Sequence, residues 1–343
     1  MMKKQNGFRF SGKLVLAAVL MGTAVLSGCA SGKQAEPAAN GTGTTEKKLT
    51  AVKQVTNWYA QPEHGGNYAA DLKGFYKEAG LDMTIQSGGP GVSATQIVAS
   101  GMAQFGMGQM DELLLARQNG IPLVAVLGTF QKSPQSLLFH KGENIKNAGD
   151  LNGRKVYVAS GASYWEYYKH KYDLSKTTEL KYTGDLSSFI NDKSAVVQSY
   201  ITSEPYVLKQ KGIETEYLLN ADQGYTLYGN VMFTTEAYIK DHPQEVKAFV
   251  EATVKGWDYF KDHSSEINTY IKEKNPDNPM DVMEYGAKAL QPLVYEGDAA
   301  THGVGYMSKE RWEQLNKQLV EIGLLKAPQD VSKVFTTEFL PKK

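Results

Sequence analysis

Apolar positions in the first part of the chain alternate between short runs and helical stripes. Short apolar or alternating runs, which predict strands, occupy residues 49–56, 81–86, 104–107 and 122–127. Apolar side chains at helical spacing predict helices over residues 67–79, 92–100 and 109–118, the first of them ended by Gly80. The last run, 122–127, is apolar throughout, as is typical of a buried parallel strand. This order predicts an open α/β sheet.

The same alternation returns further along and then gives way to helices. Strands are predicted for residues 136–140, 155–159, 179–182, 195–199 and 215–219, and helices for residues 163–172, 186–191 and 203–210. After Gly229 one more strand is predicted at 231–234 and a helix at 245–260. Ser308 is a candidate cap for a last helix whose apolar stripe contains Trp312, Leu315 and Leu319.

Two α/β units of similar size indicate a bilobed protein. We expect residues 49–135 and 230–343 to form lobe 1 and residues 136–229 to form lobe 2. Two hinge crossings, near 129–137 and 225–233, would join the lobes, and a ligand would lie in the cleft between them. Closure of such a cleft is a hinge motion.

The N-terminal residues read as an export signal. They carry Lys3, Lys4, Arg9 and Lys13 without an acidic residue, and an apolar run over 14–21 follows. A basic start and a short apolar core predict a secretory signal peptide over 1–28, and the core is too short for a comfortable membrane span. A transmembrane anchor is the alternative. Residues 30–48 lack apolar periodicity and are rich in Gly, Thr, Ala and Pro, so that residues 29–48 are predicted to be a flexible tether.

The sole cysteine sharpens this interpretation. Leu26-Ser27-Gly28-Cys29 resembles the lipobox of bacterial lipoproteins, which implies lipidation of Cys29 after cleavage and a protein held at the extracytoplasmic face of the cell membrane. One Cys also excludes an internal disulfide and a Cys-rich metal site. The full chain has 37 basic and 37 acidic residues, and removal of 1–28 leaves 33 and 37. That balance argues against a nucleic-acid binder.

Candidate binding residues gather where predicted strands lead into helices. The loop after the first strand offers Trp58, Tyr59, His64 and Asn67 as stacking and hydrogen-bonding groups. Each aromatic residue could instead pack its lobe, and His64 could be a structural hydrogen-bonding residue. The loop after the second strand offers the backbone of Gly88 and Gly89, unless it is only a tight turn.

Four further loops complete the candidate set. Gln109 starts the third helix, where Asp111 is expected to cap the helix rather than contact a ligand. Further stacking and polar candidates are Ser160, Tyr164, Trp165, Glu204 and Tyr228. Glu204 could place a carboxylate at the cleft or complement the helix dipole. Neither a Gly-x-Ser-x-Gly nor a His-Glu-x-x-His motif is present, so no catalytic set or metal site is predicted.

These loops resemble a known family. The motifs are Trp58-Tyr59 followed by His64-Gly65-Gly66-x-Tyr68, then Ala79-Gly80-Leu81, Gly88-Gly89-Pro90, residues 99–107, residues 150–156, and Thr202-Ser203-Glu204-Pro205. They resemble the ThiY-like branch of periplasmic binding proteins, which also includes the SsuA-like and thiamine-pyrimidine-synthase-like proteins. The resemblance implies a type II periplasmic-binding-protein fold and a monomeric solute receptor that delivers its ligand to an ABC permease and its ATPase.

The resemblance also limits the classes of ligand to be expected. Relatives take up thiamine pyrimidine precursors, riboflavin, or nitrate, sulfonates and taurine. The His-Gly-Gly-x-Tyr loop and the aromatic residues favour a formylaminopyrimidine or hydroxymethylpyrimidine, with riboflavin second, because the candidate loops contain no Arg or Lys for an anion. Glu204 would accept hydrogen bonds from ring amino groups. Fungal thiamine-pyrimidine synthases share the fold but use pyridoxal phosphate, iron and a Cys-rich segment, whereas this chain has one Cys and an export signal. We therefore expect a receptor without a cofactor rather than an enzyme.

Overall fold

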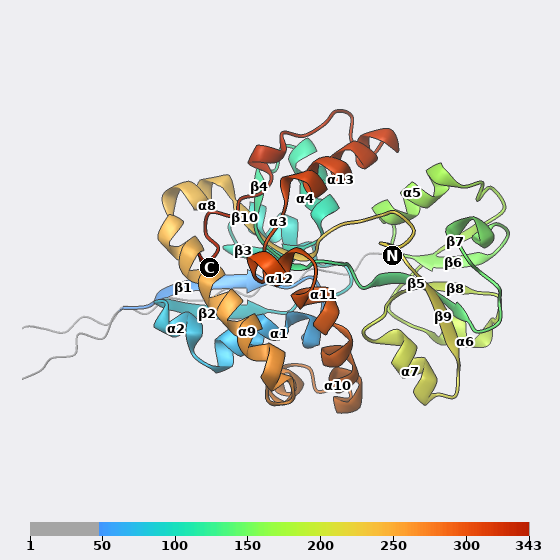
Figure 1. Ribbon diagram of the computed structural model, residues 1–343, viewed down its shortest axis with the longest axis horizontal. Helices are drawn as coiled ribbons and strands as arrows, with labels where there is room; N and C mark the ends of the chain where they lie inside the picture. The colour runs from blue at the N-terminus through green and yellow to red at the C-terminus, as the bar shows by residue number, and fades with distance from the viewer. Residues whose placement is uncertain (1–47, 343) are drawn as a thin grey trace, which may run out of the picture. The chain divides into compact units, whose positions relative to one another are not determined.

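Two five-stranded sheets organise the residues that the structure describes. The computed structural model describes residues 48–342, which belong to one compact unit (Figure 1). The predicted signal peptide, Cys29 and all but the last residue of the predicted tether lie outside the described residues. No helix among the described residues is long and apolar enough to cross a membrane.

The first sheet combines strands from both ends of the described chain. Its order is β2-β1-β3-β10-β4, with bounds Leu81–Gln86, Thr50–Val55, Phe105–Gly108, Gly229–Thr235 and Leu123–Phe130. β1 pairs in parallel with β2 and β3, whereas β10 is antiparallel to both β3 and β4. The prediction that residues 122–127 form a parallel strand is therefore wrong. β4 is an edge strand, and its burial comes from bridges of Ala125 to Phe335 and of Gly128 to Gly305, which cover that edge.

The second sheet repeats this plan. Its order is β7-β6-β8-β5-β9, with bounds Thr178–Lys181, Lys155–Val158, Val196–Tyr200, Gln135–His140 and Thr215–Leu219. β5 is the strand antiparallel to its neighbours β8 and β9. The chain enters this sheet through residues 131–134 and returns to the first sheet through residues 220–228. The α/β class expected from the alternating pattern is confirmed. The division into lobes at residues 135 and 230 stays a prediction.

Helices cover the sheets and set the positions of the loops between strands. Their bounds are η1 Pro62–His64, α1 Gly65–Leu72, α2 Phe75–Glu78, α3 Ala94–Ala99, α4 Met110–Gln118, η2 Ala148–Leu151, α5 Ser163–Lys171, α6 Ser187–Asn191 and α7 Glu204–Gln210. The C-terminal part contains α8 Glu236–Asp241, α9 Pro243–Lys274, α10 Met280–Ala289, α11 Gln291–Tyr295, α12 Asp298–His302, α13 Lys309–Glu321 and η3 Val331–Lys333.

Two predicted helices differ from the structure, and a third agrees with it. The helix predicted over 67–79 is broken, because Gly74 adopts a left-handed conformation with φ 73° and separates α1 from α2. α9 is much longer than the predicted 245–260 and bends at His263, whose φ and ψ are not helical. The cap of α13 is confirmed, since Ser308 Oγ accepts a hydrogen bond from the backbone N–H of Arg311, and the predicted apolar stripe is buried.

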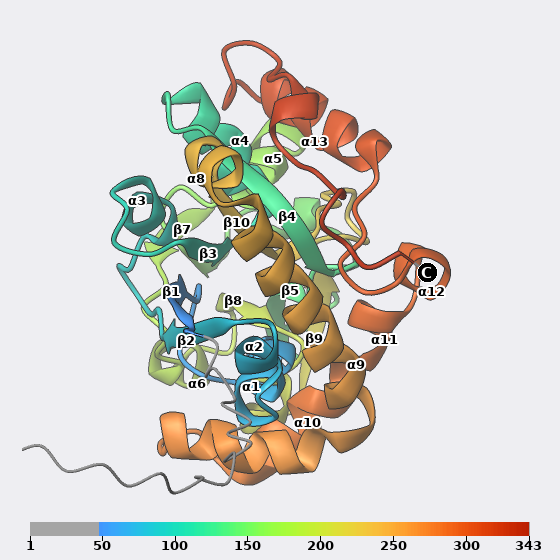
Figure 2. The ribbon, with the colours of Figure 1, turned by 90° about the vertical axis from the view of Figure 1, so that its left-hand side faces the viewer.

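Close packing of α1 on α9 holds the loop after β1 in place. α9 crosses the first sheet beside α1 and α2 (Figure 2). A Cβ atom on Gly256 of α9 would lie 2.0 Å from the backbone oxygen of Gly66 in α1, so that only glycine permits this approach. Trp257 fills the space over Gly66 on the other side. The start of α1, and with it the preceding loop, is thereby fixed against the first sheet.

The replacement Gly256→Ala should destabilise the protein. The added methyl group has no room between α9 and α1, and overpacking of this kind costs about 1–3 kcal/mol. Chemical denaturation of the mature protein measures the change in the free energy of unfolding. Lys247→Ala on the same helix, which removes one exposed ion pair with Glu251, is the control and should change the free energy by less than about 0.5 kcal/mol. Equal effects of the two substitutions would contradict the close packing.

Candidate functional site

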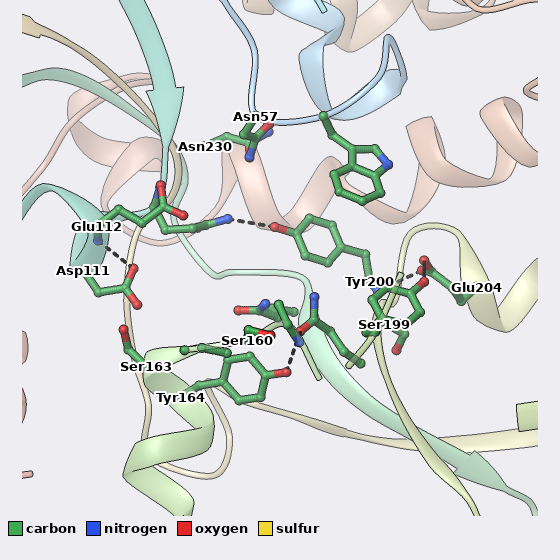
Figure 3. A pocket seen from close by; sticks show the side chains of 18 of the residues that line it. Asn57, Asp111, Glu112, Ser160, Ser163, Tyr164, Ser199, Tyr200, Glu204 and Asn230 are labelled. Atoms are coloured by element: carbon green, nitrogen blue, oxygen red, sulfur yellow. Dashed lines mark hydrogen bonds between the residues drawn. The ribbon is translucent and has the colours of Figure 1, made fainter. Parts of the chain in front are cut away.

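A cavity of about 340 Å³ lies where strand ends of both sheets meet (Figure 3). From the first sheet it receives Asn57, Trp58, Gln61, Gln109, Asp111, Glu112, Leu115 and Asn230. From the second sheet and its loops it receives Gln135, Ala159, Ser160, Gly161, Ala162, Ser163, Tyr164, Tyr182, Gln198, Ser199, Tyr200, Ser203 and Glu204. Loops at the carboxyl ends of strands are the common binding position in open α/β sheets.

Aromatic side chains supply the flat surfaces of the cavity. Trp58 stands on the loop after β1, and its indole meets the ring of Tyr59 edge-on at 5.6 Å between ring centres. Tyr200, at the end of β8, reaches across to the start of α4, where Gln109 Nε2 donates a hydrogen bond of 2.7 Å to its hydroxyl oxygen. Tyr164 is fixed by a hydrogen bond from its hydroxyl to Gln198 Oε1, at 2.8 Å. The cavity therefore offers rigid aromatic surfaces to a planar ligand.

A chain of amides joins the cavity wall to the core of the first sheet. Asn57 Nδ2 donates to Asn230 Oδ1 at 2.9 Å, and Asn230 Nδ2 donates to the backbone oxygen of Glu63 at 2.8 Å. His64 Nε2 lies 3.0 Å from Asn57 Oδ1. Burial lowers the pKa of His64 to about 3, so that the ring is neutral at neutral pH and Nε2–H is the donor to the amide oxygen. His64 thus orients Asn57 from behind the wall.

Three carboxyl groups line the cavity without a basic partner. Among the residues that the structure describes, no Lys, Arg or His lines it, while Asp111, Glu112 and Glu204 do. Burial raises the pKa of all three, most clearly that of Glu112, which reaches about 7 with the neighbouring Asp111 as a second cause. The side chain of Glu112 is exposed to the two cavities that it lines, so that its carboxyl group is less buried than those of Asp111 and Glu204.

Two of these carboxyl groups are already occupied by hydrogen bonds. Asp111 accepts from the hydroxyl of Tyr225 at 2.9 Å and from the backbone N–H of Glu112 at 3.0 Å. Asp111 was expected to cap α4, and its Oδ1 does accept the N–H of Glu112 in the first turn, although the N-cap residue is Gln109, whose backbone N–H is bound by Glu112 Oε2 at 3.1 Å.

Glu204 is held from three sides. Its Oε2 accepts from the backbone N–H of Tyr200 and from Ser203 Oγ, and its Oε1 accepts from the hydroxyl of Tyr182. The proposed role of Glu204 as acceptor for ring amino groups is weakened by these contacts. Its observed contacts instead fix the loop that carries Tyr200.

A further carboxyl group lies behind the wall. Glu63, in η1, is 2% exposed, and its Oε1 accepts a hydrogen bond from Thr202 Oγ1 of the loop after β8. Burial raises the pKa of Glu63 to about 7, and the nearby charge of Glu204 adds to this. The Glu63–Thr202 hydrogen bond ties the loop after β1 to the loop after β8.

Five of the predicted site residues line the cavity. They are Trp58, Gln109, Ser160, Tyr164 and Glu204. Gly88 and Gly89 do not, because the backbone N–H of Gly88 is turned inward to Thr56 Oγ1 and to the backbone oxygen of Trp58. Tyr59 is 49% exposed and lies beside Gly89, outside the lining.

The other four predicted residues are buried in the core. Asn67 donates to Gln54 Oε1 at 2.9 Å, His64 contacts Asn57, and Trp165 Nε1 donates to Glu179 at 2.9 Å. Tyr228 is covered by α13, since its hydroxyl accepts from the backbone N–H of Ser308 and the guanidinium of Arg311 lies 3.8 Å from its ring centre. We therefore leave these four residues out of the proposed contact set.

Sequence reasoning missed several lining residues, and only some of them carried a signal. Asn57 and Tyr200 stand within loops that the sequence singled out, yet the more conspicuous neighbours Trp58 and Glu204 were chosen. Glu112 follows Asp111 at the start of a helix, where an acidic residue is ordinary. Asn230 and Gln198 carry no local signal, because distant pairing of β10 and β8 brings them to the cavity.

The fold is that of periplasmic solute-binding proteins, as the resemblance implied. The aliphatic sulphonate-binding protein SsuA of Escherichia coli superposes with a TM-score of 0.66 at 13% identity, over 85% of this chain and 94% of that one. The model of the family described as NMT1/THI5 like matches residues 61–267, and the chain belongs to this family. The family resemblance and the type II fold predicted from the sequence are confirmed.

Named relatives include binding proteins and an enzyme. The chain is 26% identical over 321 residues to the riboflavin-binding protein RibY of Chloroflexus aurantiacus, which covers 90% of each chain. It is 24% identical over 292 residues to a formylaminopyrimidine-binding protein of Halalkalibacterium halodurans, over 80% of this chain and 86% of the relative. A 4-amino-5-hydroxymethyl-2-methylpyrimidine phosphate synthase of Legionella pneumophila is 22% identical over 84% of this chain and 92% of the relative. These relatives and the SsuA fold support a solute-binding receptor of an ABC importer.

The replacement Glu63→Gln should stabilise the protein at alkaline pH. A carboxyl group whose folded pKa is about 7, above the unfolded value near 4.5, contributes stability that is lost as pH rises through that window. Glutamine keeps an oxygen acceptor for Thr202 and cannot ionise. We expect the melting temperature of the variant to exceed that of the wild type at about pH 8, with a smaller difference at about pH 5. A variant that is less stable than the wild type by the same amount at both pH values would contradict a raised pKa of Glu63.

Proposed function

We propose that the chain is the extracytoplasmic receptor of an ABC importer and that it captures a neutral heteroaromatic solute with N–H donors. The first candidate is a thiamine pyrimidine precursor, a formylaminopyrimidine or a hydroxymethylpyrimidine. The observation that carries the proposal is the composition of the cavity wall. Among the described residues, 48–342, those that line the cavity offer aromatic faces and carboxyl and amide oxygens, and none of them has a cationic side chain. A ring with amino groups complements such a wall.

The same wall argues against the anionic ligands of relatives with this fold. A nitrate, sulfonate or taurine receptor needs positive charge or several N–H donors around the anion. Here an anion would meet Asp111, Glu112 and Glu204 at short range in a poorly solvated space. The repulsion, or the protonation needed to avoid it, makes anion binding unfavourable.

The size of the cavity favours a ligand with a single ring over one with several fused rings. A volume of about 340 Å³ lies at the lower end of the usual range for ligand pockets. A substituted pyrimidine matches this space better than the three fused rings and long side chain of riboflavin. Riboflavin remains the second candidate, because a relative that covers most of the chain is named for binding it.

We propose a receptor rather than a synthase. The synthases that the sequence resembles carry a Cys-rich segment, and this chain has a single Cys, at position 29 within the lipobox-like motif. Release of a pyridoxal-type chromophore from the purified protein, with formation of a pyrimidine product, would overturn the receptor. The expected partners are the permease and ATPase of the importer, reached by a monomer tethered to the membrane through Cys29.

Ligand titration tests the first candidate. Tryptophan fluorescence of the mature protein should change saturably with formylaminopyrimidine or hydroxymethylpyrimidine, because Trp58 lies on the cavity wall. Trp58→Ala should raise the Kd about tenfold, since an aromatic stack contributes about 0.5–1.5 kcal/mol. Tyr217→Ala is the control, because Tyr217 on β9 is 47% exposed and does not line the cavity. No response to any pyrimidine, with saturable binding of riboflavin, would select the second candidate.

Membrane attachment should depend on Cys29. When the full-length gene is expressed in a bacterial host, the wild-type protein should fractionate with membranes and label with a radioactive fatty acid. Cys29→Ala removes the thiol that would receive the lipid, so that label is lost. Ser27→Ala is the control, because a small residue is retained before the cleavage site. Unchanged labelling of the Cys29 variant would contradict lipidation at this residue.

A further inference from the structure

One carboxyl oxygen in the cavity wall has no hydrogen-bond partner among the described residues. Glu112 Oε2 is used by the backbone N–H of Gln109, but Oε1 is not. Asp111 and Glu204 are each held by several donors. Glu112 is therefore the carboxyl group whose remaining hydrogen-bonding capacity is open to a ligand.

A second open acceptor belongs to Gln109, at the same start of α4. Gln109 Oε1 is buried and has no partner within the part of the chain that the structure describes, while Nε2 of the same amide is held by Tyr200. Gln109 and Glu112 are joined by the cap hydrogen bond at the start of α4. A buried acceptor without a partner costs free energy, so that Gln109 Oε1 should be satisfied when the ligand is bound, and Glu112 Oε1 is free to accept a second hydrogen bond from it. Two neighbouring acceptors match the two hydrogens of a primary amino group.

Glu112 is also accessible from two sides. It lines the cavity of Figure 3 and a second cavity of about 400 Å³ between α3 and α4. The two cavities share Asn57, Glu112 and Leu115 as lining residues. Figure 3 shows its carboxyl group beside the amide that reaches Tyr200. Trp58, Tyr200 and Glu112 line the same cavity, so that a planar ring held there is within reach of the Glu112 carboxyl group.

We propose that Glu112 is the specificity-determining residue for the ligand, and that it pairs with an amidine edge, that is, a ring nitrogen beside an exocyclic amino group. This rests on the proposed function. The amino group donates to Glu112 Oε1, and the proton on Oε2 of the carboxylic acid is shared with the ring nitrogen, while a lone pair of Oε2 still accepts the backbone N–H of Gln109. No covalent bond changes. A carboxylic acid offers one donor and one acceptor side by side, the complement of an aminopyrimidine edge.

The surroundings of Glu112 support the shared proton. The groups that face it are Asp111 on its own helix, Tyr200 at the end of β8, and Tyr225, which bonds Asp111. None carries a positive charge. With a pKa of about 7, Glu112 is protonated for part of the population at neutral pH. Above that pH the carboxylate and the ring nitrogen are both acceptors, so that affinity should fall by up to about tenfold per pH unit.

Binding of hydroxymethylpyrimidine and of its analogue with hydrogen in place of the amino group tests the proposal. Calorimetry would compare the wild type, Glu112→Gln, Glu112→Leu and the distant control Glu313→Gln on α13 at several pH values. Glutamine keeps a donor and an acceptor in place and cannot ionise, so that this variant should bind the aminopyrimidine within about threefold of the wild type near pH 6 and show no fall above pH 7. The leucine variant should bind the aminopyrimidine about tenfold or more weakly than the wild type does, and its affinity for the analogue should change little.

The outcomes separate this inference from the function on which it rests. If the wild type binds neither pyrimidine, the proposed ligand class fails, and the role of Glu112 fails with it. If the wild type binds, but Glu112→Leu weakens both ligands equally or neither, only the role of Glu112 is overturned. Should the leucine variant unfold, as a thermal melt would show, the pH profile of Glu112→Gln decides: a fall above pH 7 equal to that of the wild type overturns the proposal.

Discussion

Carboxyl groups held in a poorly solvated cavity without a basic partner are the constraint on which this site depends. An ionised carboxylate out of water is costly unless donors surround it, so that each such group must be neutral or hydrogen-bonded. Asp111 and Glu204 find donors within the protein, from Tyr225, Ser203 and the backbone. The remaining capacity belongs to Glu112, and a ligand that brings N–H donors relieves it. The ligand chemistry that we propose thus follows from the hydrogen-bonding groups of the cavity wall that have no partner among the described residues.

The fold places these groups by bringing strand ends together. The start of α4 carries Gln109, Asp111 and Glu112, and the end of β8 carries Tyr200 opposite them. Two hydrogen bonds, Gln109 to Tyr200 and Thr202 to Glu63, join the loops from the two sheets. The close packing of α1 on α9 fixes the loop after β1, which carries Asn57 and Trp58 to the cavity.

The sequence predicted the fold well and the site only in part, for physical reasons. Alternation and helical stripes are local, so that nearly every strand was found, but the insertion of β10 between β3 and β4 depends on pairing across more than a hundred residues. The extension of α9 beyond 260 was missed because its buried Ile267 and Ile271 stand among many charged residues. For the site, strand-end position identified the right loops. Side-chain direction was not predictable, because His64 and Asn67 turn into the core and Tyr228 lies under α13, which follows it by some eighty residues.

The most direct test of the site compares the binding of a neutral ligand and of anionic ligands to the same protein. Isothermal titration calorimetry of the mature wild-type protein would measure binding of hydroxymethylpyrimidine, methanesulfonate and nitrate at the same neutral pH and low salt. We expect saturable binding of the pyrimidine with one site per chain and no measurable heat from either anion, because the cavity wall, among the described residues, holds carboxyl groups and no cation. Saturable binding of methanesulfonate or nitrate, with none of the pyrimidine, would contradict this assignment of the site.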